Sequence, residues 1–157
     1  MDFFIAVSAT IAILALAVIF GTDVVAAVVQ RPVYAEIDDR SLTQVLGRGH
    51  YYGDRRLPIV GILGTVLTAV TAVLALVWGT PVTGVLSIAA LLLLVVWLML
   101  FARISAPINK VLTRAALAGE VPADVRTLQD RWESIIVLRA VLMGGSLLLL
   151  CATIALS

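Results

Sequence analysis

Four long apolar runs are the feature that most restricts how this chain of 157 residues can fold. A helix needs about 20 apolar residues to cross the hydrocarbon core of a bilayer. Each run approaches or exceeds that length, and the first continues past Asp23. The sequence therefore predicts four transmembrane helices, at about residues 3–29, 57–78, 82–104 and 133–156.

The composition supports this interpretation. Hydrophobic residues make up 62% of the chain and charged residues only 13%, whereas a soluble domain is roughly 45–50% apolar and about 25% charged. A chain this short cannot bury so much apolar surface in one core, so lipid must solvate the excess. We predict an all-α, integral membrane four-helix bundle, a single domain over residues 1–157, in the cell membrane with the lipid bilayer as its partner.

Charge and residue counts exclude several kinds of site. The net charge is +1, which gives no field for a nucleic-acid partner. The chain holds one histidine, His50, and one cysteine, Cys151. A disulfide within this sequence, a CxxC-type centre and an all-histidine metal site are therefore excluded. A metal site on His50 and nearby carboxylates has weak support, and we expect no metal and no cofactor.

The connections between the runs contain residue patterns that predict a turn and two further helical segments. Residues 79–81 (Gly-Thr-Pro) form a tight turn that predicts antiparallel neighbours for the second and third spans. Apolar residues at 108, 111, 112 and 115 have helical spacing, which indicates an amphipathic helix that lies on the interface or extends the third span and ends at Gly119. Pro122 is predicted to open a helix of about 34 residues, continuous with the fourth span and projecting into the cytoplasm.

The basic residues predict the orientation. The two long connections and their margins carry every Lys and Arg, whereas the two tails and the 79–81 turn carry none. The positive-inside rule then places both long connections in the cytoplasm and both termini outside. These eleven residues are Arg31, Arg40, Arg48, Arg55, Arg56, Arg103, Lys110, Arg114, Arg126, Arg131 and Arg139.

Two charges fall inside the apolar runs, where a charge is costly. Asp23 lies roughly 30 Å along the first helix from Phe3. Arg139 precedes Ser157 by 18 residues, roughly 27 Å along the fourth helix. The two side chains therefore reach a similar depth, and we predict that they pair. The pair either fixes the register of two helices or lines a polar pocket that opens to the cytoplasm.

Other polar residues converge on the same rim. His50, Tyr51 and Asp54 precede the second span, Asn109 follows the third, and Trp132 lies seven residues before Arg139 on the same helical face. His50 and Asp54 have the spacing of a hydrogen-bonded pair on a helix. Charged residues in this region are also typical of a solvated surface, and tyrosines of an interfacial belt.

Small residues recur along two spans. Those on the second span and a glycine pair on the fourth predict close helix packing. They are Gly61, Thr65, Ala69, Ala72, Gly144 and Gly145.

Several short motifs resemble one known family. The stretch 107–110 (Pro-Ile-Asn-Lys), the stretch 131–133 (Arg-Trp-Glu) and Arg139 are similar to the signature of a bacterial and fungal family of small four-helix membrane proteins of largely unknown function. That family includes the anthrone oxygenases of aromatic polyketide pathways. Its pattern places a histidine four residues after the tryptophan, where this chain has Ile136. The first half agrees more loosely, at Gly21, Pro32, Tyr51 and Pro58.

The resemblance implies cofactor-independent oxygenation of an anthrone, a hydrophobic small molecule, to an anthraquinone. It implies His50 as the base, the one imidazole of the chain, with Arg139 and Asn109 stabilising the enolate oxygen. Asp23, Tyr51, Asp54 and Trp132 complete the predicted pocket.

Two other functions are compatible with the same sequence. One is a non-catalytic membrane subunit or scaffold with a protein partner or a second copy of the chain. The other is a small oligomeric transporter with Asp23 as its proton or cation site. A pocket between the helices favours the enzyme, Gly/Ala faces without a pocket favour the subunit, and a water path from Asp23 to the outside favours transport.

Overall fold

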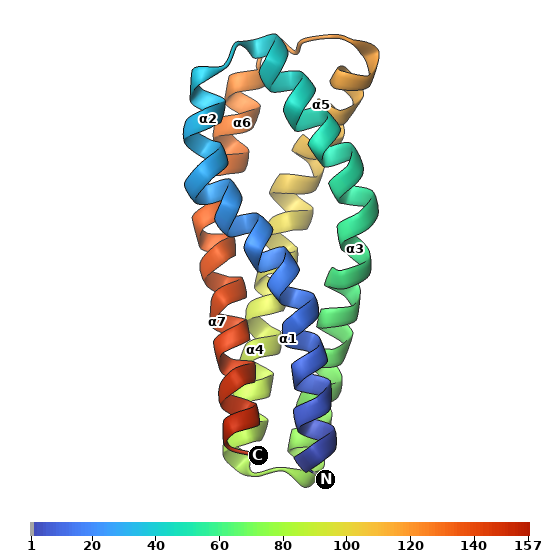
Figure 1. The fold of residues 1–157 in the computed structure, drawn as a ribbon, viewed down its shortest axis with the longest axis vertical. Helices are drawn as coiled ribbons and strands as arrows, with labels where there is room; N and C mark the ends of the chain where they lie inside the picture. The colour runs from blue at the N-terminus through green and yellow to red at the C-terminus, as the bar shows by residue number, and fades with distance from the viewer. Residues whose placement is uncertain (1) are drawn as a thin grey trace.

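The computed structural model describes residues 2–157, and every regular element in that range is a helix. Four helical rods run antiparallel to one another (Figure 1). Both termini and the 79–80 turn lie at one end, which we call the turn end; the longer connections lie at the other, which we call the basic end. The rods contact one another in the cyclic order first, second, third and fourth.

Each rod is one helix or a run of helices. The first contains α1 (Asp2–Val25), the π-helical η1 (Ala26–Gln30) and α2 (Arg31–Glu36), and the second is α3 (Asp39–Trp78). The third contains α4 (Pro81–Leu100), the π-helical η2 (Phe101–Ser105) and α5 (Ala106–Ala118), and the fourth contains α6 (Val125–Glu133) and α7 (Ile136–Ala155). All four rods are long and apolar enough to cross a membrane, which confirms the predicted all-α bundle with four candidate spans.

Prolines explain both π-helical turns. Pro32 and Pro107 each follow such a turn by two residues. A proline donates no backbone hydrogen bond, so the turn before it loses one regular i to i−4 bond. The N–H of Arg31 reaches back five residues to Ala26, and the N–H of Ala106 also reaches back five residues. π turns of this kind are common at functional sites.

Caps mark three helix ends, one of which, at Gly119, the sequence predicts. Gly119 ends α5 in the left-handed conformation, with φ of 73°. At the 79–81 turn, Thr80 caps α4 by accepting from the backbone N–H of Thr83. At the basic end, Asp38 caps α3 by accepting from the backbone N–H groups of Arg40 and Ser41.

Two helix boundaries differ from the sequence interpretation. The second rod begins at Asp39, well before residue 57, and α5 extends the third rod, which is one of the two arrangements expected for it. The fourth rod begins at Val125, not at Pro122, and it is not one continuous helix: it breaks at residues 134–135. There the Ser134 hydroxyl donates to the carbonyl of Arg131 at 2.7 Å, a local bond that competes with the helical pattern.

Two separate hydrophobic clusters hold the bundle together. The larger one runs through the half of the bundle nearer the turn end, which we call the turn half. It contains small residues such as Ala9, Ala12 and Ala90, all fully buried. In the same half the hydroxyls of Ser8 and Thr71 lie 2.9 Å apart and join α1 to α3. The smaller cluster closes the basic end, and its buried members are Leu42, Leu46, Ile108, Leu112 and Val125.

Candidate functional site

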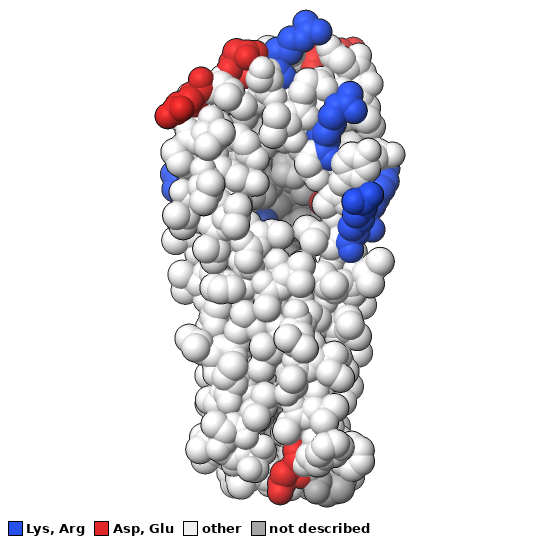
Figure 2. Space-filling model, in the orientation of Figure 1, with Lys and Arg blue, Asp and Glu red and all other residues white. Residues whose placement is uncertain are grey.

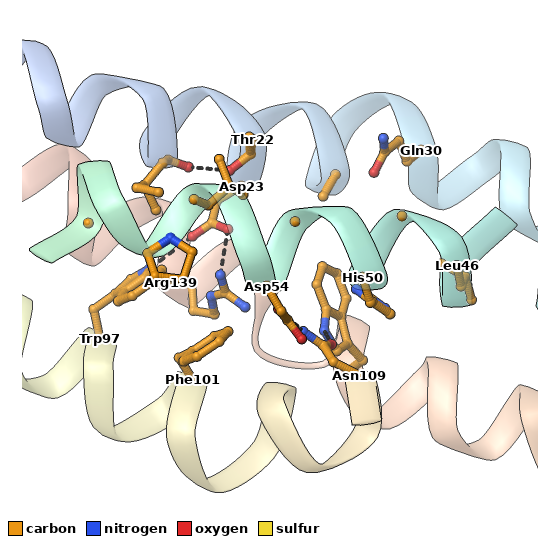
Figure 3. A pocket seen from close by; sticks show the side chains of 18 of the residues that line it. Thr22, Asp23, Gln30, Leu46, His50, Asp54, Trp97, Phe101, Asn109 and Arg139 are labelled. Carbon is orange, nitrogen blue, oxygen red and sulfur yellow. Dashed lines mark hydrogen bonds and ion pairs between the residues drawn. The ribbon is translucent and has the colours of Figure 1, made fainter. Parts of the chain in front are cut away.

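A cavity of about 350 Å³ lies between the two clusters, and all four rods contribute to its wall. That volume falls within the range of about 300–1,000 Å³ that is usual for small-molecule sites. Its lining is mostly apolar, with polar side chains gathered among aromatic rings (Figure 3). The polar and aromatic lining residues are Thr22, Asp23, Gln30, Tyr34, His50, Asp54, Trp97, Phe101, Asn109, Trp132 and Arg139.

The cavity opens on the side of the bundle. Figure 2 shows a hollow on the face formed by the first and second rods, with basic and acidic atoms visible inside it. Below the hollow the surface is uncharged down to the turn end. Charged side chains lie beside the hollow and above it. The opening therefore lies at the border between the charged and the uncharged surface of the bundle.

The predicted pair between Asp23 and Arg139 is present. Nη2 of Arg139 lies 2.7 Å from Oδ1 of Asp23, and the two side chains are only 7% and 4% exposed. The indole of Trp97 donates to the other carboxylate oxygen at 2.8 Å, and Nη1 of Arg139 donates to the hydroxyl of Ser105 at 2.7 Å. Both oxygens of Asp23 are therefore engaged, and the pair ties the first, third and fourth rods together.

Aromatic rings enclose the guanidinium of Arg139. Its central carbon lies 4.8 Å from the ring centre of Trp97 and 5.6 Å from those of Phe101 and Trp132. Trp97 and Phe101 are stacked, with ring centres 5.7 Å apart. Such rings stabilise a desolvated cation through their electron-rich faces. The Nε of Arg139 is buried and has no hydrogen-bond partner.

A second chain of hydrogen bonds crosses the cavity wall. The indole of Trp132 donates to the Asn109 carbonyl oxygen at 3.0 Å, and the Asn109 amide donates to Oδ1 of Asp54 at 2.9 Å. Asn109 itself is 3% exposed. The predicted hydrogen bond between His50 and Asp54 is wrong, because Asp54 bonds to α5 instead.

His50 lies in the wall with one nitrogen enclosed. Its Nε2 is buried without a hydrogen-bond partner, and its ring centre is 5.7 Å from that of Trp132. A substrate can meet Nε2 only if the ring turns. By contrast Asp54 lines the same cavity and is exposed.

Tyr51 lies outside the cavity, contrary to the sequence interpretation. The guanidinium of Arg55 stacks 3.7 Å from its ring centre, and the ring of Tyr52 packs against it edge to face, with ring centres 5.1 Å apart. The Tyr51 ring therefore packs with exposed side chains at the surface of the bundle.

The glycines of α3 fall into two groups. A Cβ placed on Gly47 would lie 2.3 Å from the Leu112 carbonyl oxygen, and one on Gly64 would lie 2.6 Å from Leu16. At Gly61 a Cβ would meet nothing within 4 Å. The packing role predicted for Gly61 is therefore wrong, because this glycine lines the cavity. Gly144 and Gly145 do pack closely, against Phe20 and Leu93.

Sequence reasoning missed the aromatic side of the site. Trp97 and Phe101 lie within the third apolar run, where they are indistinguishable from lipid-facing residues. The turn of η2 directs Phe101 at the cavity and Ser105 at Arg139. The one available signal was Pro107, which implies a disturbed turn just before it.

Within residues 2–157 no three His, Cys, Asp or Glu side chains gather closely enough to hold a metal ion. No family model, curated protein or solved structure matches this chain.

Proposed function

We propose that this chain is a membrane enzyme that oxygenates a flat, lipid-soluble aromatic ketone of the anthrone kind without a cofactor. One observation carries the proposal: an apolar cavity of suitable size brings a carboxylate, an amide, an imidazole and a guanidinium to one place. Apolar pockets with a few convergent polar groups are the usual form of small-molecule sites.

The chemistry needs a base and an oxyanion partner. A base removes a proton from the CH₂ group opposite the carbonyl, and the charge spreads to the carbonyl oxygen. The carbanion adds O₂, the peroxide takes up the proton, and loss of water leaves a second carbonyl. The balance is one CH₂ group and one O₂ converted to one C=O group and one H₂O, and O₂ is the oxidant.

Two side chains can supply the base. His50 is the candidate from the family resemblance, but its Nε2 is enclosed. Asp54 is exposed in the cavity and has one oxygen fixed by Asn109, which leaves the other oxygen for a substrate proton. A base must lie within hydrogen-bond reach of the proton it removes, which favours Asp54 in the conformation observed.

Arg139 and Asn109 are the partners for the developing oxyanion. The Asn109 amide has two N–H groups and donates one to Asp54, so the second remains. Arg139 keeps an unpartnered Nε–H, but this atom is enclosed, as Nε2 of His50 is, and it can meet a substrate only after a neighbouring side chain moves. Donors fixed in a water-poor site stabilise such charge more strongly than they would in water.

The alternatives have less support. A proton or cation site at Asp23 needs a free carboxylate oxygen, and both oxygens of this buried residue are engaged. A scaffold or subunit needs no cavity, and glycines that line one are hard to explain by packing alone.

The orientation is part of the proposal: the basic end faces the cytoplasm and both termini face outside. The clustering of all eleven basic residues supports it. Single cysteines at Ser41, Thr127 and Ser157 in a Cys151→Ser background test it with a membrane-impermeant thiol reagent on intact cells. We expect labelling only at position 157, and labelling of the two loop positions would reverse the orientation.

O₂ consumption by the purified protein with an anthrone tests the activity. We expect turnover above the uncatalysed rate that persists with chelators and needs no added flavin. Asp54→Asn should lose about 10²–10⁴-fold if it is the base, and His50→Ala should lose that factor if His50 is. Asn109→Ala and Arg139→Lys should each weaken turnover, and Tyr52→Phe, on the exposed surface, should not. A rate equal to uncatalysed autoxidation would contradict the proposal.

A further inference from the structure

We propose that the ligand reaches the cavity from the membrane, through the side opening between α1 and α3, and lies flat against a glycine-lined wall on α3. Gly49, Gly53 and Gly61 form this glycine wall. The inference rests on the proposed function, and it adds the route and the shape of the ligand: a planar, membrane-partitioned ring system.

The first step is that the glycine wall is not explained by helix packing. All three glycines line the cavity. A Cβ on Gly49 or Gly61 would meet nothing within 4 Å, and one on Gly53 would meet only Leu57 at 3.8 Å. Glycine weakens a helix relative to alanine, so packing gains nothing from these residues. Their shared structural effect is to leave space in the cavity between the other side chains of α3 that line it.

The second step is the shape of the space. The lining positions of α3 run from Val45 to Ile62, roughly 25 Å along the helix axis. Across the cavity from this wall, α4 and η2 contribute Trp97 and Phe101, whose rings are parallel to within 2° (Figure 3). A wall with three glycines on one side and two parallel aromatic rings on another suits a planar aromatic ligand better than a branched lipid chain.

The third step is that the basic end is closed. The buried cluster that includes Leu42 and Leu112 fills the bundle there. Arg126 on α6 also holds the connection between α2 and α3 in place, because it donates hydrogen bonds to Asp39 at 2.7 Å and to the Tyr34 carbonyl at 2.9 Å. A ligand arriving along the bundle axis from that end would have to displace the cluster and break these hydrogen bonds.

The fourth step is that the side of the bundle is open. Val45 and Ile62 line the cavity and are also 51% and 64% exposed. The hollow in Figure 2 lies just above the uncharged surface. In a membrane-inserted bundle this opening faces the boundary between acyl chains and headgroups, where a planar aromatic ketone accumulates. The Nε of Arg139 in the cavity wall is buried and unpartnered, and it can donate to such a ketone once a neighbouring side chain moves aside.

The test uses the full chain in lipid nanodiscs, with anthraquinone as the probe. A Trp78→Phe background leaves Trp97 and Trp132, both in the cavity wall, as the only tryptophans. Quenching of their fluorescence then reports binding. Gly53→Leu should weaken binding by about tenfold or more, because its side chain occupies the space beside the ligand.

The matched control is Gly21→Leu on α1. A Cβ there also meets nothing within 4 Å, but Gly21 does not line the cavity. Both variants should unfold near the wild-type temperature, and Gly53→Ala provides a smaller change if the leucine variant does not fold. Equal binding in the Gly53 and Gly21 variants would overturn the glycine wall and leave the proposed function intact. An absence of quenching in the Trp78→Phe background would overturn both.

The route has its own measurement. We vary the lipid content at constant total anthraquinone and follow the rate of quenching. The rate should follow the mole fraction of probe in the bilayer, and a water-soluble anthraquinone sulfonate should bind more slowly by about tenfold or more. A rate that follows the aqueous concentration of anthraquinone, or equal rates for the two probes, would overturn access from the membrane.

Discussion

The two halves of this bundle use the same four rods for different purposes. In the turn half, alanines and hydroxyl-bearing residues are fully buried and the helices approach closely, as at Ser8 and Thr71. In the basic half, which is the half nearer the basic end, bulky aromatic residues and a buried ion pair surround an open cavity. The residues that pack the helices together and the residues that enclose the cavity therefore occupy different stretches of the same helices.

The border between the halves is sharp on α3. A Cβ on Gly64 would clash with Leu16, whereas a Cβ on Gly61, less than one turn away, would meet nothing. Helix irregularities follow the same border. Pro58, the two π-helical turns and the break at residues 134–135 lie in the basic half, and the described part of the turn half has only Pro81, at a helix start.

The largest expected effect concerns the buried pair. Asp23→Asn or Arg139→Leu alone should destabilise the protein in detergent by about 3–5 kcal/mol, because the remaining group is left without its partner at low exposure. The double variant should lose less than the sum of the two. Thermal unfolding of the three variants measures this, and strictly additive losses would show that the pair contributes no coupling.

The next effect compares the two glycines at the border. Gly64→Ala should cost about 1–3 kcal/mol, because Leu16 is 1% exposed and has little room to move. Gly61→Ala should be neutral or should stabilise the fold by up to about 1 kcal/mol, since alanine favours a helix. Unfolding curves of the two variants check this, and equal losses would abolish the distinction between a packed and an open half.

The smallest effect concerns two helix starts. Hydrogen bonds from the Ser41 side chain and backbone hold the pKa of Asp38 below its ordinary value of 3.8. The cap on α3 therefore contributes fully above pH 3.8 and is lost as the pH falls through the lower, folded-state pKa. The cap on α4 is the uncharged Thr80 and should not respond.

Amide NMR shifts of Ser41 and Thr83 between pH 2 and pH 6 would follow both caps. We expect Ser41 to titrate and Thr83 to stay constant, and Asp38→Asn, which still accepts a hydrogen bond, to abolish the titration. A constant Ser41 shift in the wild type would argue against this cap.

Much of the framework follows from the sequence because it depends on local rules. The apolar runs predict the rods, Gly119 predicts a left-handed cap, and two costly charges at one depth predict the ion pair between Asp23 and Arg139. Each conclusion needs only helix geometry and the cost of burying a charge.

The cavity could not be predicted in the same way. Whether a glycine such as Gly61 admits a neighbouring helix or leaves a space depends on how α1 and α3 cross, and the sequence does not specify that crossing. The orientation of Tyr51 was missed for a related reason: it depends on stacking with Arg55 at the surface. The break at residues 134–135 was not predicted, because the apolar spacing of the fourth run continues through it.

The most direct test of a ligand site in the basic half is a crystal structure of the protein with a brominated anthraquinone, with bromine located by its anomalous signal. We expect a peak inside the cavity between α1 and α3, beside Gly53 and near the rings of Trp97 and Phe101. A peak confined to the outer, lipid-facing surface, or a cavity filled only by ordered water at saturating probe, would contradict the account.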